Sequence, residues 1–140
     1  MILLDTNVVS EMMKPVPADV VHAWLDRQSS DTLFISTITQ AEIQFGIAVM
    51  PGGQRKQRLE QLYSGIERLF AGRILPFDSA AALVYADLAA AARSAGQGLP
   101  MPDGYIAGIA AAHGFTVATR DTAPFHAAGL KVIDPWAAAP

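Results

Sequence analysis

The sequence predicts a three-layer α/β/α sandwich with a central parallel five-stranded sheet, formed by a single domain over residues 1–140. Short apolar segments alternate along the chain with longer segments of helical periodicity, and strands that alternate with helices pair in parallel through right-handed crossovers. A chain of 140 residues has the usual length of one domain, and a second core would not fit. Its 51% content of hydrophobic residues suffices for one core without disulfides.

The first half of the chain is predicted to form a strand, a helix, a strand and two helices, at Met1–Asp5, Ala18–Gln28, Thr32–Ser36, Thr37–Met50 and Gln54–Ala71. The strands are short apolar runs, whereas the helices repeat apolar residues every three or four positions. The turn sequence Pro51-Gly52-Gly53 separates the last two helices.

The second half is predicted to form a strand, two helices and two further strands, at Arg73–Phe77, Ser79–Ala95, Asp103–His113, Phe115–Thr119 and Leu130–Asp134. Gly96 and Gly114 directly follow the two helices, in the position where glycine commonly ends a helix. The loop Gln97–Pro102 joins them.

Composition excludes several classes of protein. The chain has no cysteine, which excludes disulfides, thiolate metal sites and a cysteine nucleophile, and which suits a reducing cytosol. Asp5 interrupts the opening apolar run too early for a signal peptide, and no run reaches the ~18 apolar residues of a membrane span. We therefore expect a soluble, cytoplasmic protein. A net charge of −3 is unusual for a nucleic-acid binder, except where bound cations reverse the charge of an acidic pocket.

Four acids fall where such a sheet places ligands. Asp5 ends the first strand, Asp121 follows the fourth by two residues, Asp103 opens the helix before that strand, and Glu42 lies early in the helix after the second strand. Ligands of parallel α/β sheets bind beyond the carboxyl ends of the strands, near the point where the strand order reverses. We therefore expect the four carboxylates to meet at one edge of the sheet.

Clustered carboxylates predict a metal site. They cannot all stay ionised without a cation between them, and oxygen ligands select hard ions such as Mg²⁺ or Mn²⁺. Glu42 also shares a helical stripe with Ile38, Phe45 and Val49, where an unpaired charge would be costly to bury. Ions held by carboxylates can polarise a phosphodiester and activate water, so such a site could support phosphodiester hydrolysis, but the residue pattern alone gives only an acid-rich α/β domain.

Each acid also has a purely structural interpretation, which the residues alone leave open. Glu42 stands at the last position of a capping-box pattern, and Asp103 fits the first turn of a helix, where negative charge is favourable. Asp5 and Asp121 could each cap a helix. Asp78 is a useful comparison, because it too follows a strand and precedes a helix.

Four segments together resemble the PIN-domain family, and within it the VapC-type toxins of bacterial toxin–antitoxin pairs: Leu3–Glu11, Ser36–Gly46, Pro102–Ala110 and Val117–Phe125. The likeness extends from Met1 to about Trp136. In the last segment an acid, Asp121, stands where many such toxins have Asn, and Pro124 stands where they have Asp. This variation and the closing Asp134-Pro135-Trp136 are most similar to the Fit-type subgroup.

The resemblance implies an endoribonuclease that depends on Mg²⁺ or Mn²⁺, with Asp5, Glu42, Asp103 and Asp121 as its catalytic and metal-binding acids. Asp5 and Asp103 would contact the metal directly. It further implies a homodimer and a cognate, DNA-binding antitoxin that lays a peptide over the acidic groove. Residues 37–50 are apolar nearly all round, so this helix either meets a partner or is buried twice within the monomer.

Two other protein classes that place an acid after the first strand fit the sequence less well. A haloacid-dehalogenase-type phosphatase needs a second Asp where Asn7 stands, and a receiver domain needs a Lys after a late strand, whereas Lys131 begins one. The main alternative is a catalytically weak PIN-like module that binds RNA or an antitoxin. Arg120, beside Asp121, could either contact a substrate phosphate or pair with an acid.

Overall fold

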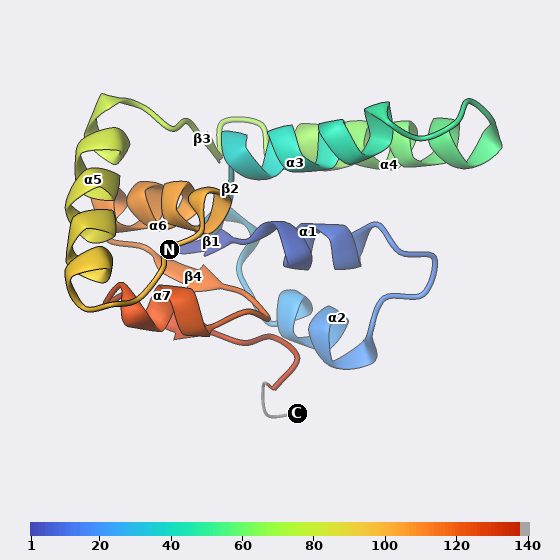
Figure 1. The fold of residues 1–140 in the computed structure, drawn as a ribbon. Coiled ribbons are helices and arrows are strands. Elements are labelled where there is room, and N and C mark those ends of the chain that lie inside the picture. Colours follow the sequence, from blue (N-terminus) through green and yellow to red (C-terminus); the bar gives the residue numbers. More distant parts are fainter. Residues whose placement is uncertain (138–140) are drawn as a thin grey trace.

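A five-stranded parallel sheet forms the centre of the computed structural model, which describes residues 1–137 (Figure 1). The strand order is β3-β2-β1-β4-β5. The strands are β1 Ile2–Leu4, β2 Leu33–Ser36, β3 Ile74–Leu75, β4 Thr116–Ala118 and β5 Val132–Ile133. The chain adds β2 and β3 on one side of β1, and then β4 and β5 on the other. The strand order therefore reverses between β1 and β4, which is where this class of sheet binds ligands.

Helices cover both faces of the sheet. One face packs against α1 Thr6–Met12, α2 Asp19–Asp26, α3 Thr37–Ala48 and α4 Gln54–Leu69, and the other against α5 Ser79–Ser94, α6 Met101–His113 and α7 Ala123–Ala127. Neighbouring residues of a strand enter opposite cores, because side chains alternate across a sheet. Leu4 and Ala118 belong to the first core, and Leu3 and Val117 to the second. The predicted three-layer sandwich is thus confirmed.

The predicted elements all occur, but with altered ends. The two edge strands, β3 and β5, are only two residues long, and α6 begins at Met101, two residues before the predicted start. Two helices, α1 and α7, and a single 3-10 turn at Ser30–Thr32 were not predicted. α1 and α7 span seven and five residues, which is too short for an apolar repeat to be recognised.

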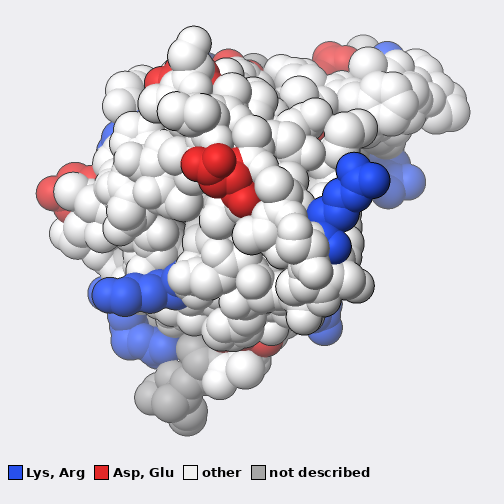
Figure 2. Space-filling view, turned by 60° about the vertical axis from the view of Figure 1, so that its left-hand side comes forward, with Lys and Arg blue, Asp and Glu red and all other residues white. Residues whose placement is uncertain are grey.

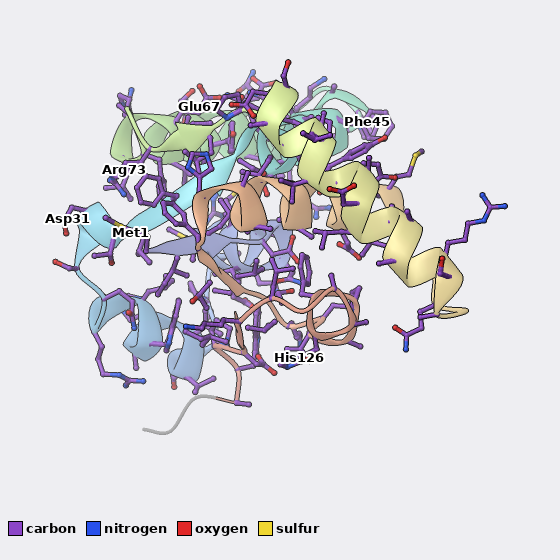
Figure 3. All side chains as sticks on the ribbon, turned by 90° about the vertical axis from the view of Figure 1, so that its left-hand side faces the viewer. Met1, Asp31, Phe45, Glu67, Arg73 and His126 are labelled. Atoms are coloured by element: carbon purple, nitrogen blue, oxygen red, sulfur yellow. The ribbon has the colours of Figure 1, made fainter. Side chains whose placement is uncertain are left out.

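Helix α3 corrects one prediction. Its buried positions are Thr39, Ile43 and Ile47, whereas Phe45 is 68% exposed and Val49 is 64% exposed. Glu42 is exposed together with these two residues of its stripe, so the expectation that Glu42 lies among buried apolar residues is wrong; only Ile38, one turn earlier, packs against the second core. The alternative that α3 is buried on two sides within the monomer holds only for its first turn, where Ile38 meets the second core, and is wrong for the turns that carry Phe45. Figure 1 shows α3 and α4 as an arm that extends past the sheet, and Figure 3 labels Phe45 on it.

None of the helices within residues 1–137 is both long and apolar enough to cross a membrane.

Candidate active site

Asp5 lies at the carboxyl end of β1, and only 4% of it is exposed. Its Oδ1 accepts a hydrogen bond from the Thr6 N–H at 2.8 Å and thereby caps α1, while its Oδ2 accepts one from the Thr119 hydroxyl at 2.7 Å. Burial raises the pKa of Asp5; these two hydrogen bonds oppose the rise, and the charges of Glu42 and Asp121 add to it. Asp5 is thus both a helix cap and a buried carboxylate facing other acids.

The Thr119 hydroxyl joins the ends of β1 and β4. It receives hydrogen bonds from the Asp121 backbone N–H and from Asn7 Nδ2, each at 3.1 Å. Because both of these partners are donors, the single hydroxyl proton points to Asp5. Asn7 Oδ1 in turn accepts the Arg120 backbone N–H at 3.3 Å. This network fixes the orientation of the Asp5 carboxylate across the point where the strand order reverses.

Glu42 is exposed on α3 and is held by one side chain, that of Thr6 on α1. The Thr6 hydroxyl donates to Glu42 Oε1 at 2.8 Å and lies 2.9 Å from the Thr39 hydroxyl. Ser36 is the N-cap of α3, and its hydroxyl accepts the Thr39 N–H at 3.1 Å. Glu42 therefore takes no part in capping α3, and the capping-box interpretation of this residue is wrong.

Asp103 lies in the first turn of α6 and is partly buried. Its pKa is raised to about 6, first by burial and then by the negative charges of Asp5, Asp121 and Glu42. Four carboxylates from separate parts of the sequence therefore act on one another electrostatically.

The position of Asp103 follows from the close packing of α6 on α5. A Cβ at Gly104 would lie 2.7 Å from the Tyr85 ring, and one at Gly108 would lie 2.8 Å from the Ala81 carbonyl oxygen. Glycine at these two positions lets the helices approach, and the phenol of Tyr105 completes an aromatic contact with Tyr85 at 4.8 Å.

Three of the four acids line one cavity of about 460 Å³: Asp5, Glu42 and Asp103. Asp121 does not lie on its wall; it lines a neighbouring hollow of about 410 Å³ together with Pro124. The charge of Asp121 nevertheless raises the pKa of both Asp5 and Asp103. Three of the four predicted acids therefore line the cavity, and the fourth, Asp121, lies outside its wall.

Glu11 also lines this cavity and was not predicted. It is only 4% exposed, and it accepts a hydrogen bond from Lys14 Nζ at 3.1 Å. Glu11 lies four residues after Asn7, so the two share one face of α1. The sequence would have indicated Glu11 only if α1 itself had been predicted.

The donor set suits a hard divalent cation. The cavity offers carboxylate oxygens, and the pKa values of Asp5 and Asp103 are raised first by burial and then by the charges of the other acids. Within residues 1–137, no three acidic or histidine side chains are grouped tightly enough to enclose an ion in their present rotamers. The chemistry of the donors fits Mg²⁺ or Mn²⁺, and closure around an ion would require side-chain rotation.

Comparison with known proteins agrees with this geometry. The model of the PIN domain matches residues 2–130. The chain is 52% identical to the VapC ribonuclease Y4jK of Sinorhizobium fredii, over 97% of this chain and 98% of that one. It is 47% identical to the toxin FitB of Neisseria gonorrhoeae, over 97% and 99%. The solved structure of FitAB bound to an IR36 DNA fragment matches with a TM-score of 0.93 and 45% identity, over 100% and 99% of the chains. The chain therefore belongs to the PIN-domain family.

Proposed function

We propose that this protein is an endoribonuclease that depends on Mg²⁺ or Mn²⁺ and acts as the toxin of a toxin–antitoxin pair in the cytoplasm. The observation that carries the proposal is the cavity in which Asp5, Asp103 and Glu42 come together beside the reversal of strand order. The names of its relatives, a VapC ribonuclease and a toxin, support the same activity.

In this proposal Asp5 and Asp103 hold the metal, with Glu42 and Asp121 completing the acidic shell. A divalent ion bound there would polarise a phosphodiester of RNA and favour ionisation of a water. Thr119 keeps the Asp5 carboxylate in one orientation, so this one ligand is already oriented before an ion or substrate arrives. Glu42 is exposed and is held through Thr6, which leaves it placed to accept a proton from the attacking water.

We further propose that the antitoxin covers a groove beside the acidic cavity. This groove of about 500 Å³ lies between α1, α3 and α4, and its wall includes Ile43, Ile47 and Leu59. It shares Thr6 and Glu42 with the acidic cavity, so one peptide could cover both. The relative FitB was solved in FitAB bound to DNA, which supports an antitoxin that binds DNA.

A homodimer is the third part of the proposal. Phe45 on α3, Val49 at the C-cap of α3 and Leu83 on α5 are each more than 60% exposed. Figure 2, which brings the side of α5 forward, shows a surface on which charged side chains are few and scattered. Apolar residues exposed in this way are typical of a contact surface. Phe45→Glu should convert a dimer into a monomer in analytical ultracentrifugation, whereas an unchanged sedimentation coefficient would exclude α3 from the interface.

The nuclease proposal is tested by incubating antitoxin-free protein with total cellular RNA in Mg²⁺, Mn²⁺ or EDTA. We expect discrete fragments with either metal, and none with EDTA or after Asp5→Asn or Asp103→Asn. Asp78→Asn is the matched control, because Asp78 caps α5 outside the cavity and Asn caps a helix equally well. Absence of metal-dependent cleavage by the wild type would favour the binding module. That alternative has its own support, since Pro124 replaces an acid and Asp121 lies off the cavity wall.

A further inference from the structure

Arg120 and Trp136 lie on the wall of the acidic cavity and approach it from the ends of two neighbouring strands. Arg120 follows β4 directly after Thr119, and its backbone N–H is held by the side chain of Asn7. Trp136 follows β5, where its backbone N–H donates to Asp134 Oδ1 at 2.9 Å and its side chain packs against the first hydrophobic core. Both residues are therefore fixed at the backbone.

Their side chains stack. The guanidinium carbon of Arg120 lies 5.0 Å from the centroid of the Trp136 ring, within the range of a cation–π contact. Stacking uses the flat face of a guanidinium, whereas its N–H donors lie in the plane and stay available for an anion. The contact also restricts an otherwise mobile side chain, which lowers the entropy lost when an anion binds.

Arg120 keeps its charge unpaired in an acidic setting. Two cations, Lys14 and Arg120, line the cavity, and Lys14 forms an ion pair with Glu11. Among residues 1–137 Arg120 makes no ion pair, although three candidate catalytic carboxylates line the same cavity. Of the two roles that the sequence left open for Arg120, pairing with an acid is thus excluded for the part of the chain that the structure describes.

We propose that Arg120, held by Trp136, binds a phosphate of the RNA strand and positions that strand over the carboxylates. The inference rests on the proposed function, because it takes RNA as the substrate. A polyanion that approaches Asp5, Glu42 and Asp103 is repelled, and a guanidinium on the wall offsets that repulsion. Guanidinium and phosphate also match in geometry, since two parallel N–H donors can reach two phosphate oxygens.

The test measures RNA binding separately from cleavage. A fluorescein-labelled, single-stranded oligoribonucleotide of mixed sequence is titrated by anisotropy in Mg²⁺ at several salt concentrations, with Asp5→Asn as the parent so that the probe stays intact. Adding Arg120→Ala should weaken binding by about tenfold, as expected on loss of a charge-assisted pair of hydrogen bonds. It should also reduce the slope of log affinity against log salt by about 0.7, the value for one phosphate contact on a single strand.

Lys131→Ala is the matched control. It removes one exposed positive charge just before β5, at the amino ends of the strands and away from the cavity at their carboxyl ends, and should change neither the affinity nor the salt slope. Trp136→Leu keeps an apolar side chain but removes the ring face, so it should weaken binding less than Arg120→Ala. It should add little to Arg120→Ala, because both changes disable the same contact. Arg120→Lys, which keeps one charge, should fall between the parent and the alanine variant and serves if Arg120→Ala does not fold.

An unchanged affinity and salt slope in the Arg120 variants would overturn the inference, whether or not the wild type cleaves RNA. Equal weakening by Lys131→Ala would overturn it as well, because the effect would then be one of net charge alone. If the wild type cleaves no RNA while Arg120→Ala still weakens binding as expected, the assignment of Arg120 stands and the nuclease proposal fails.

Discussion

Asp103 makes the folded protein less stable at neutral pH, and this can be tested without any assay of activity. Its pKa in the folded chain is raised from 3.8 to about 6. Between these two values the folded state holds a proton that the unfolded state has lost. The free energy of unfolding therefore falls as pH rises from about 4 to about 6, and it stays lower above that range. Asp103→Asn removes this loss, so we expect the variant to be more stable than the wild type at pH 7.5.

The size of the effect follows from the shift and from the exposure of the side chain. A rise of about two units corresponds to at most about 3 kcal/mol. Asp103 is only partly buried, and solvent screens the charges around it, so we expect about 1 kcal/mol. For a domain of this size that corresponds to an increase in Tm of about 3 to 5 °C.

The assay is thermal unfolding of wild type and Asp103→Asn in EDTA at pH 4 and at pH 7.5. At each pH the Tm of the wild type is subtracted from that of Asp103→Asn. To first order, this difference removes the effect on Tm of every other group that titrates. We expect a difference near zero at pH 4 and the full increase at pH 7.5. A variant that is less stable than the wild type at pH 7.5 would refute the reasoning, because the favourable position of Asp103 in the first turn of α6 would then outweigh the repulsion.

Further predictions concern packing, the hydrogen-bond network and metal binding. Gly108→Ala should lower the free energy of unfolding by about 1 to 3 kcal/mol in urea, because its Cβ would meet a backbone oxygen of α5 at 2.8 Å. Gly46→Ala, with nothing within 4 Å on exposed α3, should raise that free energy by about 0.5 to 1 kcal/mol. Thr119→Val should cost about 1 to 3 kcal/mol and reduce cleavage by freeing the Asp5 carboxylate, and Thr119→Ser should restore both. Mg²⁺ at a hundred times its Kd should stabilise the wild type by about 2.7 kcal/mol, measured as an increase in Tm that EDTA reverses and Asp5→Asn abolishes.

The central part of the fold could be predicted from sequence because its signals are local and repeated. β1 and β4 are apolar runs, and both end where polar side chains follow. The rule for parallel sheets then places those ends together, and the structure shows the Thr119–Asp5 hydrogen bond at that place. The two edge strands, β3 and β5, were predicted too long. Each ends where the neighbouring strand, β2 or β4, stops offering backbone partners, and the sequence of an edge strand does not show where its neighbour ends.

The exposure of Glu42 could not be predicted from sequence, for a different reason. Helix α3 carries apolar residues on two stripes, and periodicity alone does not show which stripe meets the sheet. Packing buries the stripe of Ile43 and Ile47 and leaves Phe45 in solvent. Glu42 was grouped with the other acids because it lies early in the helix that follows β2, and it does line the cavity with Asp5 and Asp103; only the separate statement about its burial was wrong. What holds Glu42 near them is Thr6 of α1, a helix too short to be recognised in advance.

Asp5 and Asp78 show why structural and functional interpretations of an acid need not exclude each other. Both follow a strand and cap a helix, Asp5 through the Thr6 N–H and Asp78 through the Ala81 N–H at 3.0 Å. They differ in the position of the strand. β1 is central and lies beside the reversal of strand order, so the second oxygen of Asp5 meets Thr119 from β4. β3 is an edge strand away from that reversal, and among the described residues the carboxylate of Asp78 makes no hydrogen bond besides the one from the Ala81 N–H. A carboxylate has two oxygens: one can cap a helix, and the position of its strand in the sheet determines whether the other also contacts a functional site.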